Sequence, residues 1–260
     1  MNRAGAKTRW GHFFWAAARQ LAEIARLTVL GAVRSRRPKG ELVRQFYQVG
    51  NRSFLFVLVT LGFTGMVLVF QSCLQLSQVT GDLSQVGSEF IKYLVHEFGP
   101  SLTAMMLATR VGAGIAAEVG SMVVTEQVDA LQMCGVEPVE YLLAPRFFAT
   151  LVMAVVLSVF GTLSAILLGG FAAHQTFHVP YAVFLDFDKV RLVDVFTGFV
   201  KALAYGAAIP IVSGFCGLRT SGGSEGVGWA TTRAVVFSSF AVIVLDFLIS
   251  ALALLTWQAA

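Results

Sequence analysis

The sequence predicts an all-α integral membrane protein with an interfacial N-terminal helix and five transmembrane helices. Apolar residues make up 56% of the 260 residues and charged residues only 13%, about half the charged fraction of a soluble domain. No charged residue lies between Arg52 and Asp82 or between Arg146 and Asp186. Each stretch exceeds the roughly 20 residues that a helix needs to cross a bilayer. Their continuous apolarity also argues against an outer-membrane barrel, whose strands alternate polar and apolar residues.

The same composition excludes several other classes of protein. So low a charged fraction excludes a cytosolic enzyme and a disordered chain. The three cysteines, Cys73, Cys134 and Cys216, are far apart and odd in number, which excludes a disulfide-stapled module, and we expect them to be buried singly. The basic N-terminal segment also contains Trp and Phe, which suits an anionic membrane surface better than nucleic acid. No nucleic-acid partner is therefore expected.

Residues 9–34 are predicted to form one amphipathic helix. At about 100° per residue, Trp10 and Phe14 fall on one side of this helix, whereas Arg19 and Glu23 fall on the other. A helix of this kind lies in the membrane interface rather than across the bilayer. We therefore expect an interfacial helix ahead of the first span.

The expected transmembrane region, 53–257, contains five spans. They lie at about 53–76, 88–110, 147–173, 193–217 and 234–257. Eleven of the nineteen Lys and Arg residues lie within the first 52 residues, and basic residues favour the cytoplasmic side of a membrane protein. The N-terminus is therefore predicted to be cytoplasmic, and five crossings place the C-terminus on the opposite side. Residues 1–260 are predicted to form a single domain.

The connection 111–145, between the second and third spans, is predicted to contain a cytoplasmic amphipathic helix that ends at Gly135. Its apolar face holds Val119, Met122, Val123, Ala130, Met133 and Cys134, and its polar face holds Glu118, Ser121, Thr125, Asp129 and Gln132. Such a helix either packs on the membrane surface or docks a soluble partner. The pattern of residues leaves both uses open.

No motif for a cofactor or a metal is found in the chain. A phosphate-binding P-loop requires a Gly-Lys pair, and the sequence contains none, so any ATP must be bound by another subunit. His174 and His178 are four residues apart, but no Cys or carboxylate follows them before Asp186. We interpret these histidines as interfacial residues outside the third span rather than as zinc ligands.

Three ionisable residues, Glu97, Lys201 and Asp246, lie within predicted spans. A charge near the bilayer centre costs several kcal/mol, so it is usually paired or faces a cavity. Glu97 and Lys201 are therefore either a fixed ion pair that holds helices together or a polar patch that meets a charged lipid headgroup. Asp246 is interpreted as mainly structural.

Gly161, Ala165, Gly169 and Ala173 repeat at four-residue spacing along the third span. A stripe of small residues lets two helices approach closely in lipid. The partner is either another helix of the same chain or a second copy of the chain, and the spacing alone does not decide.

A series of short motifs follows in a fixed order along the chain. They are His96-Glu-Phe-Gly-Pro100, Arg110-Val-Gly-Ala-Gly-Ile-Ala-Ala-Glu118, Thr125-Glu-Gln-Val-Asp-Ala-Leu131, Gly135-Val-Glu-Pro138, Tyr141-Leu-Leu-Ala-Pro-Arg146, Ser224-Glu-Gly226, Ala230-Thr-Thr-Arg-Ala-Val-Val236 and Leu245-Asp-Phe247. Together, over about residues 40–257, they resemble the MlaE/YrbE family of ABC-transporter permeases. Their shared order is far more specific than any one motif.

The resemblance implies a homodimeric permease of the bacterial inner membrane that moves lipids, in many relatives glycerophospholipids that pass between the inner and outer membranes. It implies a cytoplasmic ABC ATPase, which binds ATP and Mg²⁺, as a partner. In many systems a small STAS-domain subunit accompanies the ATPase, and an MCE-domain protein lies on the periplasmic side.

The resemblance also implies roles for particular residues. The connection 111–145 would carry the coupling helix that docks the ATPase, through Glu118, Thr125, Glu126 and Asp129. Glu97 is similar to a family glutamate near the lipid cavity, and we expect His96, Glu97, Lys201 and Arg233 to bind the substrate. Many relatives have Arg where this chain has His96. An imidazole can gain or lose its proton near neutral pH, so the headgroup preference can differ here.

Two other functions fit part of the pattern. A secondary transporter or channel could use Glu97 and Lys201 as an ion relay, but no inverted repeat accompanies them. An intramembrane enzyme could use His96 and Glu97 as acid and base, but it would lack a nucleophile or a metal site. The lipid permease also accounts for a docking helix, so it is the preferred interpretation.

Overall fold

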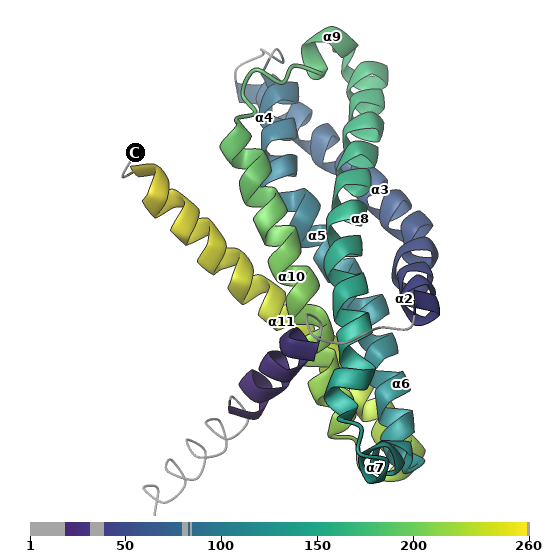
Figure 1. Ribbon diagram of the computed structural model, residues 1–260. Coiled ribbons are helices and arrows are strands. Elements are labelled where there is room, and N and C mark those ends of the chain that lie inside the picture. The colour runs from purple at the N-terminus through teal and green to yellow at the C-terminus, as the bar shows by residue number, and fades with distance from the viewer. Residues whose placement is uncertain (1–18, 32–38, 80–82, 84, 259–260) are drawn as a thin grey trace, which may run out of the picture.

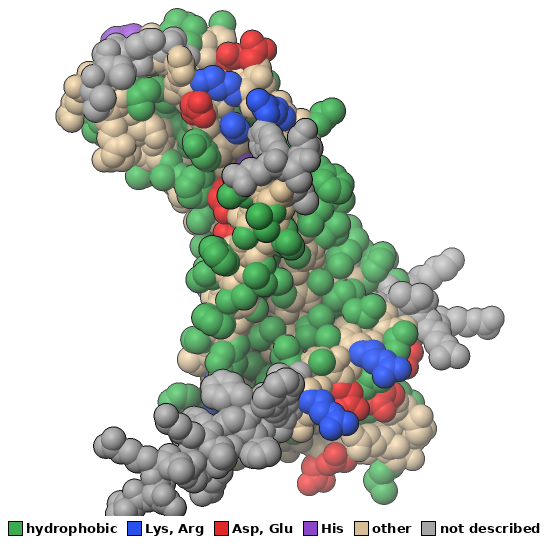
Figure 2. Space-filling view, turned by 90° about the vertical axis from the view of Figure 1, so that its left-hand side faces the viewer, with side chains coloured by type: hydrophobic (Ala, Val, Ile, Leu, Met, Phe, Trp, Pro, Cys, Tyr) green, Lys and Arg blue, Asp and Glu red, His purple; other side chains and the backbone are tan. Residues whose placement is uncertain are grey.

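The computed structural model describes residues 19–31, 39–79, 83 and 85–258, and within these ranges every regular element is a helix. Five helical segments of the described chain are long and apolar enough to cross a membrane, which confirms the predicted all-α membrane fold. They are Gly40–Gln78, Val86–Val124, Pro138–Phe177, Leu192–Leu218 and Gly223–Leu255. Figure 1 shows an elongated bundle. In Figure 2 charged side chains gather mainly towards its two ends and the middle is mostly apolar.

The helix at 19–31 is the described part of the predicted interfacial helix, and residues 9–18 and 32–34 lie outside the described residues. Thr28 of this helix is fully buried, and Ile24 packs against the hydrophobic core. Arg219, which follows the fourth span, donates a hydrogen bond to Gln20. The helix is therefore held against the bundle by both apolar and polar contacts.

The first two spans are long helical runs interrupted by π-helical turns. The first consists of α2 (Lys39–Phe46), η1 (Tyr47–Asn51) and α3 (Arg52–Val79), and the second consists of α4 (Val86–Tyr93), η2 (Leu94–Phe98), α5 (Gly99–Leu107), η3 (Ala108–Gly112) and α6 (Ala113–Val124). Pro100 explains η2, because proline has no N–H and its ring crowds the carbonyl of His96, four residues before it. The helix widens there instead of breaking.

The connection after the second span differs from the continuous helix predicted there. α6 ends at Val124, where the Thr125 hydroxyl donates to the Ser121 carbonyl (2.9 Å). Glu126 has a left-handed backbone (φ +58°), and the short helix α7 (Gln127–Met133) follows it. The prediction of one helix is wrong because the threonine hydroxyl competes for the helix backbone and a left-handed residue cannot continue a right-handed helix.

The tip formed by α7 is largely exposed. Met133 is 90% exposed, and Cys134 is exposed as well. The prediction of a buried thiol is therefore wrong for Cys134, whereas Cys73 and Cys216 are buried as predicted. Of the apolar face predicted for this segment, Val119 is buried in the core, whereas Ala130, Met133 and Cys134 are not covered by the rest of the described chain.

The last four helices are α8 (Pro138–Phe177), α9 (Tyr181–Phe184), α10 (Leu192–Leu218) and α11 (Gly223–Gln258). The 40 residues of α8 span about 60 Å, twice the hydrocarbon thickness, so the predicted span 147–173 is only its middle part. Gly222 and Gly223 have positive φ values (+90° and +73°), which glycine adopts readily, and the chain reverses there into α11. Because α7 and α9 lie at opposite ends of the bundle (Figure 1), we call these the α7 end and the α9 end.

The small-residue stripe of α8 packs against α3. Gly161 lies against Leu61, and Gly169 lies against Val69. On α3, a Cβ added to Gly65 would approach the Ala165 carbonyl oxygen to 2.7 Å, so the two backbones meet closely. The stripe is therefore a contact between two helices of the same chain.

The substitutions Gly161→Leu and Gly169→Leu are each expected to lower the free energy of unfolding by about 1–3 kcal/mol, the usual cost of overpacking. An added Cβ alone would approach Leu61 Cδ2 to 2.9 Å or Val69 Cγ2 to 2.8 Å. Thermal unfolding in detergent measures the effect. Gly228→Leu on α11 is the control, since nothing lies within 4 Å of its added Cβ. Equal melting temperatures for all three variants and the unsubstituted protein would contradict the packing of α3 on α8.

Candidate functional site

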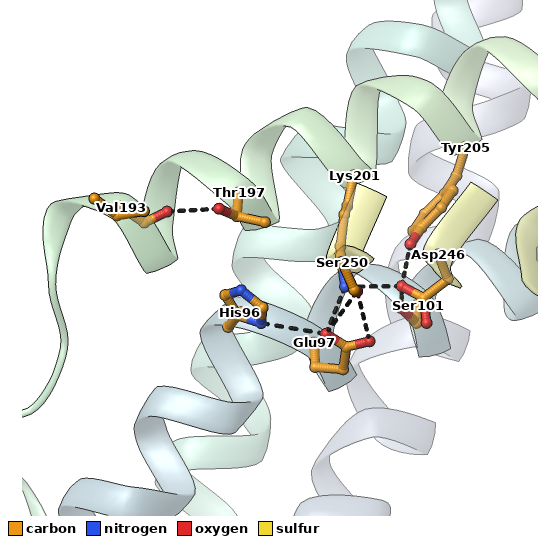
Figure 3. Close-up of polar contacts among 9 residues, drawn as sticks. All are labelled: His96, Glu97, Ser101, Val193, Thr197, Lys201, Tyr205, Asp246 and Ser250. Carbon is orange, nitrogen blue, oxygen red and sulfur yellow. Dashed lines mark hydrogen bonds and ion pairs between the residues drawn. The ribbon is translucent and has the colours of Figure 1, made fainter. Parts of the chain in front are cut away.

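Six polar side chains from three helical runs meet inside the bundle, and we call them the Lys201 cluster (Figure 3). They are Glu97 of η2 and Ser101 of α5, Lys201 and Tyr205 of α10, and Asp246 and Ser250 of α11. Each run supplies two residues four positions apart, a spacing that places both on one helix face. The cluster therefore joins the second, fourth and fifth spans.

The Lys201 ammonium lies between two carboxylates. Its Nζ donates to Glu97 Oε2 at 2.5 Å and lies 2.9 Å from Asp246 Oδ1. The hydroxyls of Tyr205 and Ser101 also donate to Asp246 Oδ1, that of Ser101 at 3.1 Å. One oxygen of Asp246 thus receives donors from two neighbouring helices.

Glu97 has two further neighbours. The Ser250 hydroxyl donates to Glu97 Oε1 at 3.4 Å, and His96 Nδ1 lies 3.2 Å from Glu97 Oε2. Together with Lys201, these contacts hold the carboxylate from three directions. When its ring is protonated, His96 adds a second cation to this side of the cluster.

The close approach of α10 to η2 brings these charges together. A Cβ added to Gly198 would lie 2.3 Å from the Val95 carbonyl oxygen, so only glycine permits this contact without a shift of the backbone. The π turn at η2 follows from Pro100, and Glu97 lies within that turn. A glycine on one helix and a proline on the other therefore position the Glu97–Lys201 pair.

Burial differs sharply among the charged members of the cluster. The Lys201 side chain is 0% exposed, whereas those of Glu97, Asp246 and His96 are 31%, 25% and 26% exposed. A buried ammonium needs paired carboxylates, and Lys201 has two. The accessible edge of the cluster consequently presents two carboxylates and an imidazole, with the lysine behind them.

The structure brings together three of the four residues predicted to bind substrate, namely His96, Glu97 and Lys201. Arg233 is exposed and lies thirteen residues before Asp246 on α11, about 20 Å away at 1.5 Å per residue. It lies on the part of α11 nearer the α7 end. The structure therefore does not bring Arg233 to the cluster.

Sequence reasoning did not identify the whole cluster. Asp246 stands out as a charge in a span, but nothing indicates that it shares Lys201 with Glu97. Ser101, Tyr205 and Ser250 carry no charge, so hydropathy does not single them out. The signal that could have found them is their spacing of four residues from the charged residue of the same helix.

The residues predicted to dock a partner lie at the α7 end. Glu118 on α6 pairs with Arg146 on α8 at 2.8 Å, and the Thr125 hydroxyl bonds to the end of α6. Glu126 and Asp129 are exposed, so of the four residues these two carry charge that is not paired within the described chain.

Next to these residues lies a groove of about 910 Å³ between α2, α6, α7 and α8. Its polar lining includes Glu41, Arg44, Glu118, Gln127, Glu140 and Arg146. The groove is large enough for several side chains of another molecule. Among the described residues, no group of three or more His, Cys, Asp or Glu side chains could hold a metal ion.

Comparison with known proteins finds a matching family and several similar proteins. A family profile described as Permease MlaE matches residues 42–252. A probable ABC transporter permease of Rickettsia typhi is 35% identical over 213 residues, which cover 81% of this chain and 82% of that protein. A probable ABC transporter permease of Synechocystis is 35% identical over 80% of each chain. The MlaE permease protein of the intermembrane phospholipid transport system of Haemophilus influenzae is 33% identical over 81% of this chain and 82% of its own.

Lys201→Met is expected to lower the free energy of unfolding by up to about 3–5 kcal/mol, because it leaves two carboxylates in the bundle without their cation. Adding Glu97→Gln and Asp246→Asn should restore most of the loss, since no unpaired charge then remains. Denaturant or thermal unfolding in detergent measures both steps. A single variant as stable as the unsubstituted protein, or a triple variant no better than the single one, would show that Lys201 does not balance these carboxylates.

Proposed function

Since this chain belongs to the MlaE permease family, we propose that it is the membrane subunit through which an ABC transporter moves phospholipid between the inner membrane and a periplasmic MCE-domain protein. The observation that carries the proposal is the Lys201 cluster, whose accessible carboxylates and imidazole lie within membrane-spanning helices. A polar edge at that depth is costly unless it meets a polar substrate. A phospholipid headgroup is such a substrate.

We place the α7 end on the cytoplasmic side. The basic residues towards that end include Arg44, Arg52, Arg110, Arg146, Arg219 and Arg233, whereas the α9 end has Lys92, Lys189 and Arg191. An excess of basic residues favours the cytoplasmic side. The N-terminus is then cytoplasmic, the C-terminus is periplasmic, and the membrane is the bacterial inner membrane.

The exposed α7 tip is the surface proposed to dock the ATPase. Glu126 and Asp129 present negative charge there, and the uncovered Met133 adds an apolar contact. The groove beside the tip extends the same surface, and Glu118 and Gln127 line it. ATP and Mg²⁺ would bind to that partner, and a STAS-domain subunit would accompany it.

A second copy of the chain is proposed to complete the permease. Only 11% of the most apolar window of α11 is buried, against 33–50% for the other spans of the described chain, and the C-terminal end of α11 stands apart from the other helices (Figure 1). The accessible edge of the Lys201 cluster includes Asp246 of α11. A partner copy beside α11 would therefore enclose the lipid path between the two protomers.

The alternative is a secondary transporter or channel that uses Glu97 and Lys201 as an ion relay. Such a protein would move its substrate without an ATPase, whereas the permease would require one. Lys201 is fully buried between its two carboxylates, which suits a fixed cation better than a relay open to solvent. Substrate movement by the reconstituted chain alone would favour the alternative.

Glu126→Lys and Asp129→Lys are expected to weaken association with a co-expressed ATPase by about tenfold or more, as reversal of a charge at a docking surface does. ATP hydrolysis would then be uncoupled from lipid transfer while the spans stay folded. Co-purification, lipid-stimulated ATP hydrolysis and lipid transfer are the measurements. Asp188→Lys, an exposed reversal at the α9 end, is the control. Normal docking and stimulated turnover in both α7 variants would overturn the assignment.

Glu97→Gln is expected to lower lipid bound per purified complex and lipid transfer, because a neutral amide cannot balance the Lys201 ammonium as a carboxylate does. ATPase docking should be unchanged. The matched control is Glu89→Gln, which removes a carboxylate of the same helical run that pairs with Lys189 at 3.0 Å near the α9 end. If the Glu97→Gln protein binds and transfers as much lipid as the Glu89→Gln protein, the Lys201 cluster only holds helices together.

A further inference from the structure

A second polar cavity, of about 160 Å³, lies towards the α7 end between the first, second and third spans. Its polar lining consists of Gln45, Gln48, Arg52, Arg110, Glu118 and Arg146. Arg110 lies thirteen residues after Glu97 in the same helical run, about 20 Å further along. We call this cavity the arginine pocket, and it is separate from the Lys201 cluster.

The charges of the arginine pocket do not balance. Its one carboxylate, Glu118, is paired with Arg146 at 2.8 Å. Arg110 donates to the Ser53 hydroxyl at 2.5 Å, and Arg52 has no side-chain hydrogen bond or ion pair with any described residue. Arg52 and Arg110 lie close enough to repel each other electrostatically. Two guanidinium groups thus share the pocket without a counter-charge.

Arg146 provides an independent indication of a ligand. Its side chain is only 10% exposed. One terminal nitrogen donates to the Leu142 carbonyl at 2.7 Å and the other to Glu118, but its Nε is buried with no partner in the described structure. A buried charged donor normally has a hydrogen-bond acceptor. This donor belongs to a residue that lines the pocket.

Among the described residues, Glu118 is the one carboxylate that lines the arginine pocket. Residues 1–18 and 32–38, which the structure does not describe, contain no Asp or Glu. Glu41, on the same helix as Gln45, pairs with Arg44 at 3.9 Å and accepts the Gln45 amide at 2.8 Å. Within the described lining, Arg52 and Arg110 therefore lack a carboxylate partner, and an anion from another molecule would complete the charge balance.

We propose that the arginine pocket binds a phosphate group, either inorganic phosphate or the phosphate of a membrane phospholipid. Guanidinium groups bind phosphate oxygens in a bidentate manner that few other anions match. Basic pockets between spans near a membrane surface are typical sites for anionic headgroups. The volume of about 160 Å³ far exceeds the roughly 10–15 Å³ that one water molecule needs on the same measure.

Two further features of the arginine pocket favour ligand binding, namely a route of entry and the position of its side chains. Its wall includes Glu118 and Arg146, which also line the larger groove at the α7 end, so the two cavities are neighbours and the groove offers a way in. The π turns η1 and η3 supply Gln48 and Arg110 to the lining. Such turns are frequent at functional sites because they displace side chains from their ordinary helical positions.

The test uses the purified full-length protein in detergent and phosphate-free buffer. Its melting temperature is followed as inorganic phosphate, a short-chain phosphatidic acid or a short-chain diacylglycerol is added. A ligand that binds the folded protein raises the melting temperature. We expect stabilisation by one or both phosphate compounds and none by diacylglycerol. Stabilisation by inorganic phosphate identifies a site for the free ion, and stabilisation by phosphatidic acid alone identifies a headgroup site.

The variants Arg52→Gln and Arg110→Gln should raise the half-saturating concentration about tenfold or more, as expected when a charge-assisted contact is lost. Arg52→Gln removes no described side-chain contact, so its fold should be intact. The matched control is Arg44→Gln, which removes a guanidinium from α2 outside the pocket. The proposal is overturned if neither phosphate compound stabilises the protein, if diacylglycerol stabilises it equally, or if Arg52→Gln binds as Arg44→Gln does. Because the readout is binding rather than transport, failure here leaves the proposed permease function untouched.

Discussion

The position of the Lys201 ammonium constrains much of the rest of the fold. A lysine that is 0% exposed in a membrane-spanning helix cannot be neutralised by water, so it requires carboxylates from neighbouring helices. Glu97 and Asp246 provide them from the second and fifth spans. Because each carboxylate must come within hydrogen-bond distance of one Nζ, the relative heights of three spans are fixed together. Gly198 and the π turn at η2 are the backbone features that make those distances possible.

Much of this architecture could be predicted from the sequence, because a helix that crosses a bilayer must be long and mostly apolar. Long apolar stretches predicted the five spans, and the scarcity of charges within them pointed to Glu97, Lys201 and Asp246. The sharing of one lysine by two carboxylates could not be predicted, because it depends on the register between helices that are more than a hundred residues apart. The break at Thr125 and Glu126 was missed since periodicity averages over a whole segment, whereas a single hydroxyl and a single left-handed residue end a helix locally. The length of α8 was missed for a similar reason, as hydropathy detects only its apolar middle.

The π turns show how local backbone irregularity and polar chemistry coincide in this molecule. Among the described residues, η2 contains Glu97 and η3 contains Arg110, while η1 ends directly before Arg52. Each of these charged residues belongs to the Lys201 cluster or to the arginine pocket. A π turn shifts a side chain around the helix axis without exposing a long stretch of backbone, which the bilayer would penalise. In η2 and η3, irregular backbone therefore coincides with a charged residue that belongs to one of these two sites.

The second span offers a physical route between the two ends of the molecule. From Val86 to Val124 it is one helical run, and it contains Glu97 of the Lys201 cluster, Arg110 of the arginine pocket and, at its last turns, the approach to α7. Its α6 part packs against both α10 and α11, which carry the other charged members of the cluster. A displacement at the α7 end that moved this run relative to α10 would change the distance from Glu97 to Lys201. Lengthening that contact would leave Asp246 as the remaining carboxylate of Lys201 and would leave Glu97 without its lysine inside the bundle.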